Sequence, residues 1–195
     1  MLDNFKSHYL IRHLFSFINN KRKLKMFKYN KILQNKLDIN HIYYKTISEK
    51  YIIYEKDGKG KEYNYCDNKL IFQGEYKNKE RNGKGKEYDN FGKLIFEGEY
   101  SNGVRNGKGK EYYNDKLRFE GEYLNGIRNG KGKEYYNNGK LEFEGEYLNG
   151  ERNGKGKEYE YDGKLKFEGE YLNGQRNGKG KKYYNNGNLN LKGNI

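Results

Sequence analysis

The chain has 195 residues, enough for one or two domains, and it is polar: 33% of its residues are hydrophobic, 34% are charged and its mean hydropathy is −1.33. The 16% of aromatic residues and the regularly placed glycines argue against a disordered chain. The net charge of +13 is concentrated at the front, where residues 1–50 hold 11 Lys and Arg but 3 Asp and Glu. Such an excess indicates either an anionic partner or a genome rich in A and T, since Lys, Asn, Ile and Tyr have A/T-rich codons.

Cysteine usage and hydropathy indicate a cellular compartment. Cys66 is the single cysteine, so the sequence offers no intrachain disulfide and no cysteine-based zinc site. The apolar run Tyr9–Ile18 is interrupted by Arg12 and His13, unlike a secretory signal, and no run reaches the roughly 18–20 apolar residues of a spanning helix. We therefore expect a cytoplasmic protein. Its basic N-terminal region could bind peripherally to a membrane.

Residues 1–50 are expected to form a helical segment. Apolar residues at helical spacing predict helices over Leu2–Asn20 and Lys21–Leu37, and a short third helix over Asn40–Ile47. The second of these helices carries a basic cluster: Lys21, Arg22, Lys23, Lys25 and Lys28. This cluster could bind anionic lipid, at about 1 kcal/mol per basic residue near an anionic leaflet, or another partner. The alternative is a solvated helix face.

Part of this segment resembles an F-box, the helical motif that docks proteins onto cullin–RING ubiquitin ligases. The resemblance is carried by Leu14-Phe15-Ser16-Phe17-Ile18, Leu24 and Tyr29-Asn30-Lys31. It lacks the Leu-Pro start of many F-boxes. The resemblance implies a ubiquitin-ligase adaptor, and the alternative is a helical cap over the first edge of a repeat array.

Residues 51–195 are periodic. The segment Phe-(Glu/Gln)-Gly-Glu-Tyr recurs every 23 or 24 residues and Gly-Lys-Gly every 23 to 25, which gives about five and a half units of a β array. The residues that we expect to build the repeat are Gly74, Tyr76, Gly83, Gly85, Gly98, Tyr100, Gly107, Gly109, Gly121, Tyr123, Gly130, Gly132, Gly145, Tyr147, Gly154, Gly156, Gly169, Tyr171, Gly178 and Gly180.

Each unit is predicted to be a β-hairpin. Leu141–Tyr147 alternates apolar or small residues with glutamates, as a strand does. Asn149–Gly154 supplies turn residues, Gly154–Tyr161 forms the return strand, and Asn138-Gly139 makes a tight turn. Consecutive hairpins then form an antiparallel meander, with paired rows of Glu and Lys on one face.

Glycine weakens a strand, so glycines within strands often mark a place where another group approaches the backbone closely. We expect that group to be an aromatic ring. The predicted occupants are Tyr147 and its equivalents. Strict alternation separates Tyr159 from the face that holds Gly154 and Gly156. A β-bulge near Lys157-Glu158 would restore Tyr159 to that face.

The repeated pattern Gly-Glu-Tyr-x-Asn-Gly-x-Arg-Asn-Gly-x-Gly resembles the MORN repeat (membrane occupation and recognition nexus). Tyr135–Leu141 is closer to the variant MORN subtype. The resemblance covers residues 51–195 and implies a mainly β, single-layer antiparallel meander in an elongated, twisted sheet, with the small α-helical segment as its N-terminal cap. The chain departs from many MORN units, which carry an aromatic residue where it has Glu111, Glu134 and Glu158.

The sequence holds no pattern typical of a catalytic site, a metal site or a cofactor site. Gly103-x-x-x-Gly107-Lys-Gly is one residue too short for a P-loop, and Gly109 stands where Ser or Thr should bind magnesium. Carboxylate pairs such as Glu144 and Glu146 recur in every unit, whereas a catalytic pair would be unique.

The leading hypothesis is therefore a non-enzymatic scaffold whose sheet binds protein partners. The resemblance also implies, for some members, a module that binds phospholipids (phosphoinositides), and the F-box-like segment implies a ligase adaptor. The glutamates interleaved among the lysines argue against nucleic acid. The sequence ends inside a unit at Lys192-Gly-Asn-Ile195, so we expect either a homodimer through the C-terminal edge strand or a frayed tail.

Overall fold

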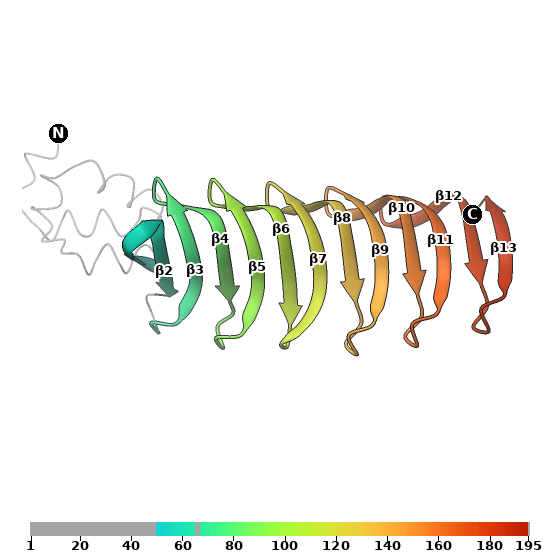
Figure 1. Ribbon diagram of the computed structural model, residues 1–195, viewed down its shortest axis with the longest axis horizontal. Helices are drawn as coiled ribbons and strands as arrows, with labels where there is room; N and C mark the ends of the chain where they lie inside the picture. The colour runs from blue at the N-terminus through green and yellow to red at the C-terminus, as the bar shows by residue number, and fades with distance from the viewer. Residues whose placement is uncertain (1–49, 65–66, 195) are drawn as a thin grey trace, which may run out of the picture. The chain divides into compact units, whose positions relative to one another are not determined.

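A computed structural model of the chain describes residues 50–64 and 67–194. The strands follow one another along the chain in a thirteen-stranded sheet of order β1 to β13, and the pairs from β3 onward are antiparallel (Figure 1). The expected meander is confirmed. The expected helices, the basic cluster and Cys66 lie outside the described residues, and the domain boundary at residue 50 stays a prediction.

The strands run over six to ten residues from β2 onward, and a single 3-10 turn, η2, separates the first two. The elements are β1 (Lys50–Tyr54), η2 (Lys56–Gly58), β2 (Lys59–Asn64), β3 (Leu70–Lys77), β4 (Glu80–Tyr88), β5 (Leu94–Ser101), β6 (Val104–Tyr113), β7 (Lys116–Leu124), β8 (Ile127–Tyr135), β9 (Leu141–Leu148), β10 (Glu151–Tyr159), β11 (Leu165–Leu172), β12 (Gln175–Tyr183) and β13 (Leu189–Asn194).

The described residues divide into two units by their internal contacts. The first unit holds residues 50–53, 62–64 and 67–70, in which the ring of Tyr51 stacks on Tyr63 at 5.4 Å between centroids. In the same unit the ammonium of Lys50 pairs with the buried carboxylate of Glu62 at 2.5 Å. The second unit holds residues 54–61 and 71–194 and therefore nearly all of the repeats.

The turns within and between hairpins differ in part from those expected. Asn149 and Gly150 both have positive φ, 52° and 91°, which is the signature of a two-residue type I′ turn. The return strand β10 therefore starts at Glu151, earlier than expected. Asn138-Gly139 belongs to a wider connection, closed by a hydrogen bond from the Tyr136 amide to the Lys140 carbonyl at 2.9 Å. The Gly139 amide donates to the Tyr136 carbonyl at 2.9 Å, so the predicted turn at Asn138-Gly139 exists, and the two-residue turn at Asn149-Gly150 is a second tight turn.

The strand register places glycine opposite glycine across the array. Gly156 faces Gly145 on one side and Gly169 on the other, while Glu158 faces Phe143. Because side chains alternate along a strand, one face of the sheet carries the phenylalanines and the other carries the Lys and Glu rows. We call these the aromatic face and the charged face.

The expected bulge exists, but its predicted consequence is wrong. The register shifts between Glu158 and Tyr159. The hydroxyl of Tyr159 nevertheless donates to Oε1 of Glu144 at 2.8 Å. Glu144 pairs with Lys157 on the charged face, so Tyr159 lies there and not over the glycines.

The glycines are covered chiefly by a phenylalanine ring. The tyrosine ring that was expected there also contacts them, but at a greater distance. A methyl group at Gly156 would lie 2.5 Å from Cζ of Phe143 and 3.1 Å from Cε2 of Tyr171. Phe143 is fully buried and Tyr171 is 4% exposed. Each Gly–Gly pair thus lets a phenylalanine lie flat enough on the sheet to be buried in a single layer.

This packing predicts that Gly156→Ala destabilises the array. The added methyl group overlaps the Phe143 ring, so we expect the free energy of unfolding in urea to fall by about 1–3 kcal/mol. Gly193→Ala is the matched control, because a methyl group there meets no atom within 4 Å, and its cost should stay within about 0.5 kcal/mol. Equal losses for the two variants would contradict this account of the glycines.

Candidate binding surface

The aromatic face is one continuous chain of rings in edge-to-face contact. The Phe143 centroid lies 5.6 Å from that of Tyr147 in its own hairpin and 5.2 Å from that of Tyr171 in the next. The same two contacts join Phe96 and Phe119 to their neighbours. Such pairs add about 0.5–1.5 kcal/mol beyond the burial of their area, so the rings link each repeat to the next.

Arginines and glutamates cover this ring chain with a second chain of alternating charge. The guanidinium carbon of Arg152 lies 4.2 Å from the centroid of Phe143. Arg152 pairs with Glu158 of its own strand at 3.4 Å and with Glu134 of the preceding hairpin. Repeated along the array, these contacts give the ion-pair chain Arg81–Glu87–Arg105–Glu111–Arg128–Glu134–Arg152–Glu158–Arg176.

Half-burial makes the charges of this ion-pair chain depend on one another. Burial alone would raise the pKa of Glu111, but hydrogen bonds and charge interactions with Arg128, helped by Tyr123 and Arg105, lower it below the ordinary 4.5. The pKa of Glu158 is lowered against burial in the same way, chiefly by Arg176. Burial and the carboxylate of Glu111 raise the pKa of Tyr123, whose hydroxyl donates to Glu111 at 2.8 Å. On the aromatic face the guanidinium groups and carboxylates therefore bind one another, although the buried hydroxyls of Tyr147 and Tyr171 have no hydrogen-bond partner among the described residues.

The charged face carries two rows of alternating Lys and Glu that run across the strands. The central row includes Lys86, Glu97, Lys110, Glu120, Lys133, Glu144, Lys157 and Glu168. The rim row, two residues nearer the type I′ turns, includes Lys84, Glu99, Lys108, Glu122, Lys131, Glu146, Lys155, Glu170 and Lys179. The expected rows of opposite charge are thus present.

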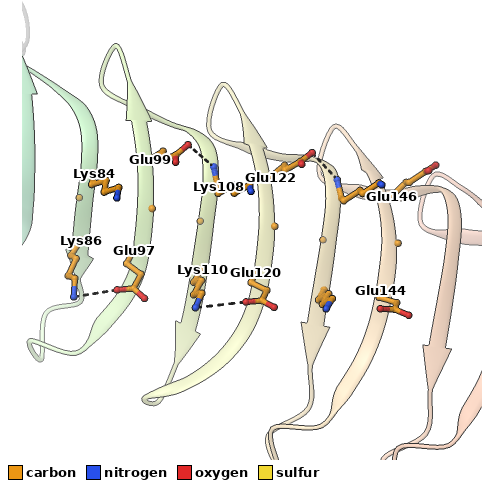
Figure 2. A pocket seen from close by; sticks show the side chains of 18 of the residues that line it. Lys84, Lys86, Glu97, Glu99, Lys108, Lys110, Glu120, Glu122, Glu144 and Glu146 are labelled. Atoms are coloured by element: carbon orange, nitrogen blue, oxygen red, sulfur yellow. Dashed lines mark hydrogen bonds and ion pairs between the residues drawn. The ribbon is translucent and has the colours of Figure 1, made fainter.

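An open groove of about 1320 Å³ lies between these rows (Figure 2). Its floor is the stripe of paired glycines, among them Gly121, Gly132 and Gly145, and its walls are the two rows. Because glycine has no side chain, the floor is bare backbone from Gly60 to Gly169. Both rows and the glycines are visible in the sequence, but the groove that they enclose together is not.

The two rows differ in how their charges are used. In the central row, Lys86 pairs with Glu97 at 3.3 Å and Lys157 with Glu168 at 3.6 Å. In the rim row, each glutamate turns to its own hairpin, as Glu146 does when its Oε2 accepts the backbone amide of Lys155 at 3.2 Å. Gly154, with φ 98°, makes room for that carboxylate, since a methyl group there would overlap it.

An apolar rim borders the rim row at the type I′ turns. It consists of Val104, Leu124, Ile127, Leu148 and Leu172, which are between 42% and 52% exposed. Leu148 faces Glu151 and Leu124 faces Ile127 across their turns. Lys77, Glu80 and Ser101 hold the equivalent positions in the earlier repeats. This apolar rim therefore distinguishes the later repeats from the earlier ones. The difference is visible in the sequence but was not used to predict a site.

The structure places the repeat-building residues in two sets. The first glycine of each Gly-Lys-Gly segment faces a tyrosine, as Gly154 faces Tyr171, whereas the second pairs with the glycines of the neighbouring strands, as Gly156 does with Gly145 and Gly169. Tyr100, Tyr123, Tyr147 and Tyr171 enter the ring chain. The ion-pair chain was missed, although four repeats signal it through an Arg and a Glu six residues apart, as in Arg152 and Glu158, and only the last has Lys182 at the second position. The departures from many MORN units at Glu111, Glu134 and Glu158 are its acceptors.

Residues 50–64 and 67–194 contain no helix long and apolar enough to cross a membrane. Within these same ranges, no three His, Cys, Asp or Glu residues gather where they could hold a metal ion.

Removing one acceptor from the ion-pair chain should be costly. Glu134→Ala leaves the guanidinium groups of Arg128 and Arg152 half-buried with one acceptor fewer each, and we expect the free energy of unfolding to fall by about 1–3 kcal/mol. Glu151→Ala, at the exposed end of β10, is the matched control and should change it by less than about 0.5 kcal/mol. Urea denaturation measures both variants, and a neutral Glu134→Ala would contradict the role of this chain.

The lowered pKa values of Glu111 and Glu158 predict loss of stability in acid. Their carboxylates stabilise the fold fully above their ordinary pKa of 4.5, and this stabilisation is lost as the pH falls through their lower folded pKa values. The urea midpoint should therefore drop between about pH 5 and pH 3. The double variant Glu111→Gln, Glu158→Gln should be less stable at neutral pH and show a shallower drop. If the urea midpoint of the double variant drops with falling pH as steeply as that of the Glu151→Gln control, Glu111 and Glu158 are not the groups responsible.

Comparison with solved structures gives only a weak likeness. Among the solved structures that match are TarM and a mutant of S. aureus TarM in complex with Fondaparinux, alpha-GlcNAc-glycerol and UDP, each with 11% sequence identity and a TM-score of 0.29. The matches cover 80% of this chain and 26% of those chains. A search of curated proteins returned no match.

Comparison with protein families identifies the repeats themselves. The MORN repeat matches residues 96–118, 119–140, 143–164 and 167–189, and the MORN repeat variant matches residues 81–102. Each matched segment begins within a strand and takes in at least one full turn between strands. MORN repeats are in general modules for interaction with proteins or lipids. From residue 81 to residue 189, the chain is therefore an array of MORN repeats.

Proposed function

We propose that this chain is a non-enzymatic interaction protein whose repeat array binds protein partners in the groove. The observation that supports this proposal is the groove itself, which is open, about 1320 Å³ in volume and lined by side chains from β2 to β12. The aromatic face has rings, guanidinium groups and carboxylates that already bind one another. The charged face offers free surface instead.

The charge of the groove favours a protein over a polyanion. Of the described residues that line it, 11 are lysines and nine are glutamates. A nucleic acid or an anionic membrane presents dense negative charge, which would lie against the glutamates as closely as against the lysines. A protein segment can place acidic, basic and apolar side chains separately, so it can match such a surface.

The other proposed partners depend on other parts of the chain. Recruitment to an acidic phosphoinositide membrane would use the basic cluster, and docking to a ubiquitin ligase would use the F-box-like segment. Both segments lie outside the described residues, including the cluster's Lys21, Arg22, Lys23, Lys25 and Lys28. A homodimer through β13 stays a prediction, as does a cytoplasmic location. No described contact favours these over the groove.

Selection from a phage-displayed random peptide library on the full-length chain tests the proposal. We expect selected peptides to bind the wild type and to lose about tenfold or more of their affinity for Lys110→Glu, Lys133→Glu, which reverses charge in the central row. The control Lys116→Glu, Lys140→Glu carries the same change at exposed positions outside the groove lining and should bind as the wild type does.

Two outcomes would overturn the proposal. In the first, selected peptides bind the groove variant and the wild type equally well. In the second, no peptide is selected while the chain floats with vesicles that contain phosphoinositides, and that result would favour the lipid-binding alternative.

A further inference from the structure

The lysines of the rim row are the free charges of the groove. Lys84, Lys108, Lys131, Lys155 and Lys179 are exposed, and among the described residues none of their ammonium groups lies within ion-pair distance of a carboxylate. The neighbouring glutamates each direct one oxygen to a backbone amide, as Glu122 does to the amide of Lys131 at 3.1 Å. Figure 2 shows Glu99 and Glu122 turned in this way. This row therefore presents five positive charges in line.

The spacing of these charges is set by the sheet. Successive rim-row lysines lie two strands apart, and strands are about 4.8 Å apart, so the lysines repeat every ~9.6 Å. A polyproline II chain has three residues per turn and rises about 3.1 Å per residue, so every third side chain points the same way at intervals of ~9.3 Å. Over the four intervals from Lys84 to Lys179 the two periods drift apart by only about 1 Å.

Other peptide conformations fit less well. In an α-helix, side chains on one face recur every three to four residues, ~5.4 Å, or every seven, ~10.5 Å, and the helix is about 10–12 Å wide. The two rows are separated by two residues along a strand, ~6.8 Å at the backbone, which is too narrow for a helix between them. A β-strand turns the same side outward every second residue, at ~6.7 Å, and does not meet successive lysines.

The alternating glutamates make this period selective. A carboxylate at every third residue of the ligand meets the lysines and passes over Glu99, Glu122, Glu146 and Glu170. A polyanion with denser charge cannot avoid them. The apolar rim beside this row, with Leu124, Ile127 and Leu148 about half exposed, offers contact to apolar side chains in the ligand turns that lie over the later repeats.

We propose that the rim row and the apolar rim bind a polyproline II segment of a protein partner that carries an acidic residue at every third position and apolar residues beside it. This proposal rests on the proposed function, because it names the kind of protein segment that the groove takes. Ligand carboxylates pair with the rim-row lysines, and the segment runs across the strands.

A synthetic peptide of five Pro-Leu-Glu triplets tests this proposal on the full-length chain by fluorescence anisotropy. The comparison peptide has the same composition with its glutamates at irregular spacing. We expect the regular peptide to bind about tenfold or more tightly than the irregular one, and its affinity to fall as salt is raised.

Lys131→Glu, Lys155→Glu should weaken the regular peptide by about tenfold or more, since each reversed charge replaces an attraction by a repulsion. Lys116→Glu, Lys140→Glu is the matched control and should leave the affinity unchanged. Because the two peptides are compared on the wild type, the test does not depend on how well the variants fold.

Equal affinity for the two peptides, or binding that survives reversal of Lys131 and Lys155, would overturn the proposal. If library peptides depend on the groove but show no acidic period of three, this inference fails while the proposed function stands. If anionic vesicles bind the rim row and both peptides fail to bind, the row is a lipid site and this inference is wrong.

Discussion

The whole array depends on one packing arrangement: a phenylalanine ring lying on a pair of facing glycines. A single sheet has no second layer to bury its apolar side chains, so burial must come from within the layer. At Gly145 and Gly156 the missing side chains let Phe143 approach the backbone, and the Phe143 ring then contacts the tyrosines of two hairpins. Arg152 covers the ring, and Glu134 and Glu158 hold Arg152 in place. Each repeat thus completes the core of its neighbour, which explains why one unit could not be stable alone.

The same glycines create the groove on the opposite face. Where the aromatic face needs room for rings, the charged face gains a floor of bare backbone between two rows of charge. Stability and binding therefore use opposite faces of the sheet. The half-buried Arg and Glu residues of the aromatic face stabilise the fold, and the exposed lysines of the charged face are available for binding. Uniform repeats give the groove its period. Leu124, Ile127 and Leu148, beside the rim row, make part of the charged face differ from the rest.

Much of the architecture could be predicted from the sequence, because its period of 23 or 24 residues and its two-residue alternation are local signals. The sequence could not place Tyr159, because a register shift at Glu158 and a hydrogen bond to Glu144 decide its face, and both involve the neighbouring strand. Nor could it separate the two Asn-Gly turns, since Asn149-Gly150 and Asn138-Gly139 look alike and differ only in backbone geometry. The ion-pair chain was missed because Glu134 and Arg152 are far apart in sequence and meet only when hairpins stack.

We propose the rim row as the binding surface of the array. The most direct measurement is an NMR titration of the full-length chain with the regular Pro-Leu-Glu peptide, following the backbone amides and the lysine side chains. We expect chemical-shift changes to concentrate at Lys108, Lys131 and Lys155 and at the apolar rim, while the signals of Arg128 and Arg152 on the aromatic face stay unchanged. Shifts confined to residues 1–50, or spread over the aromatic face, would contradict it.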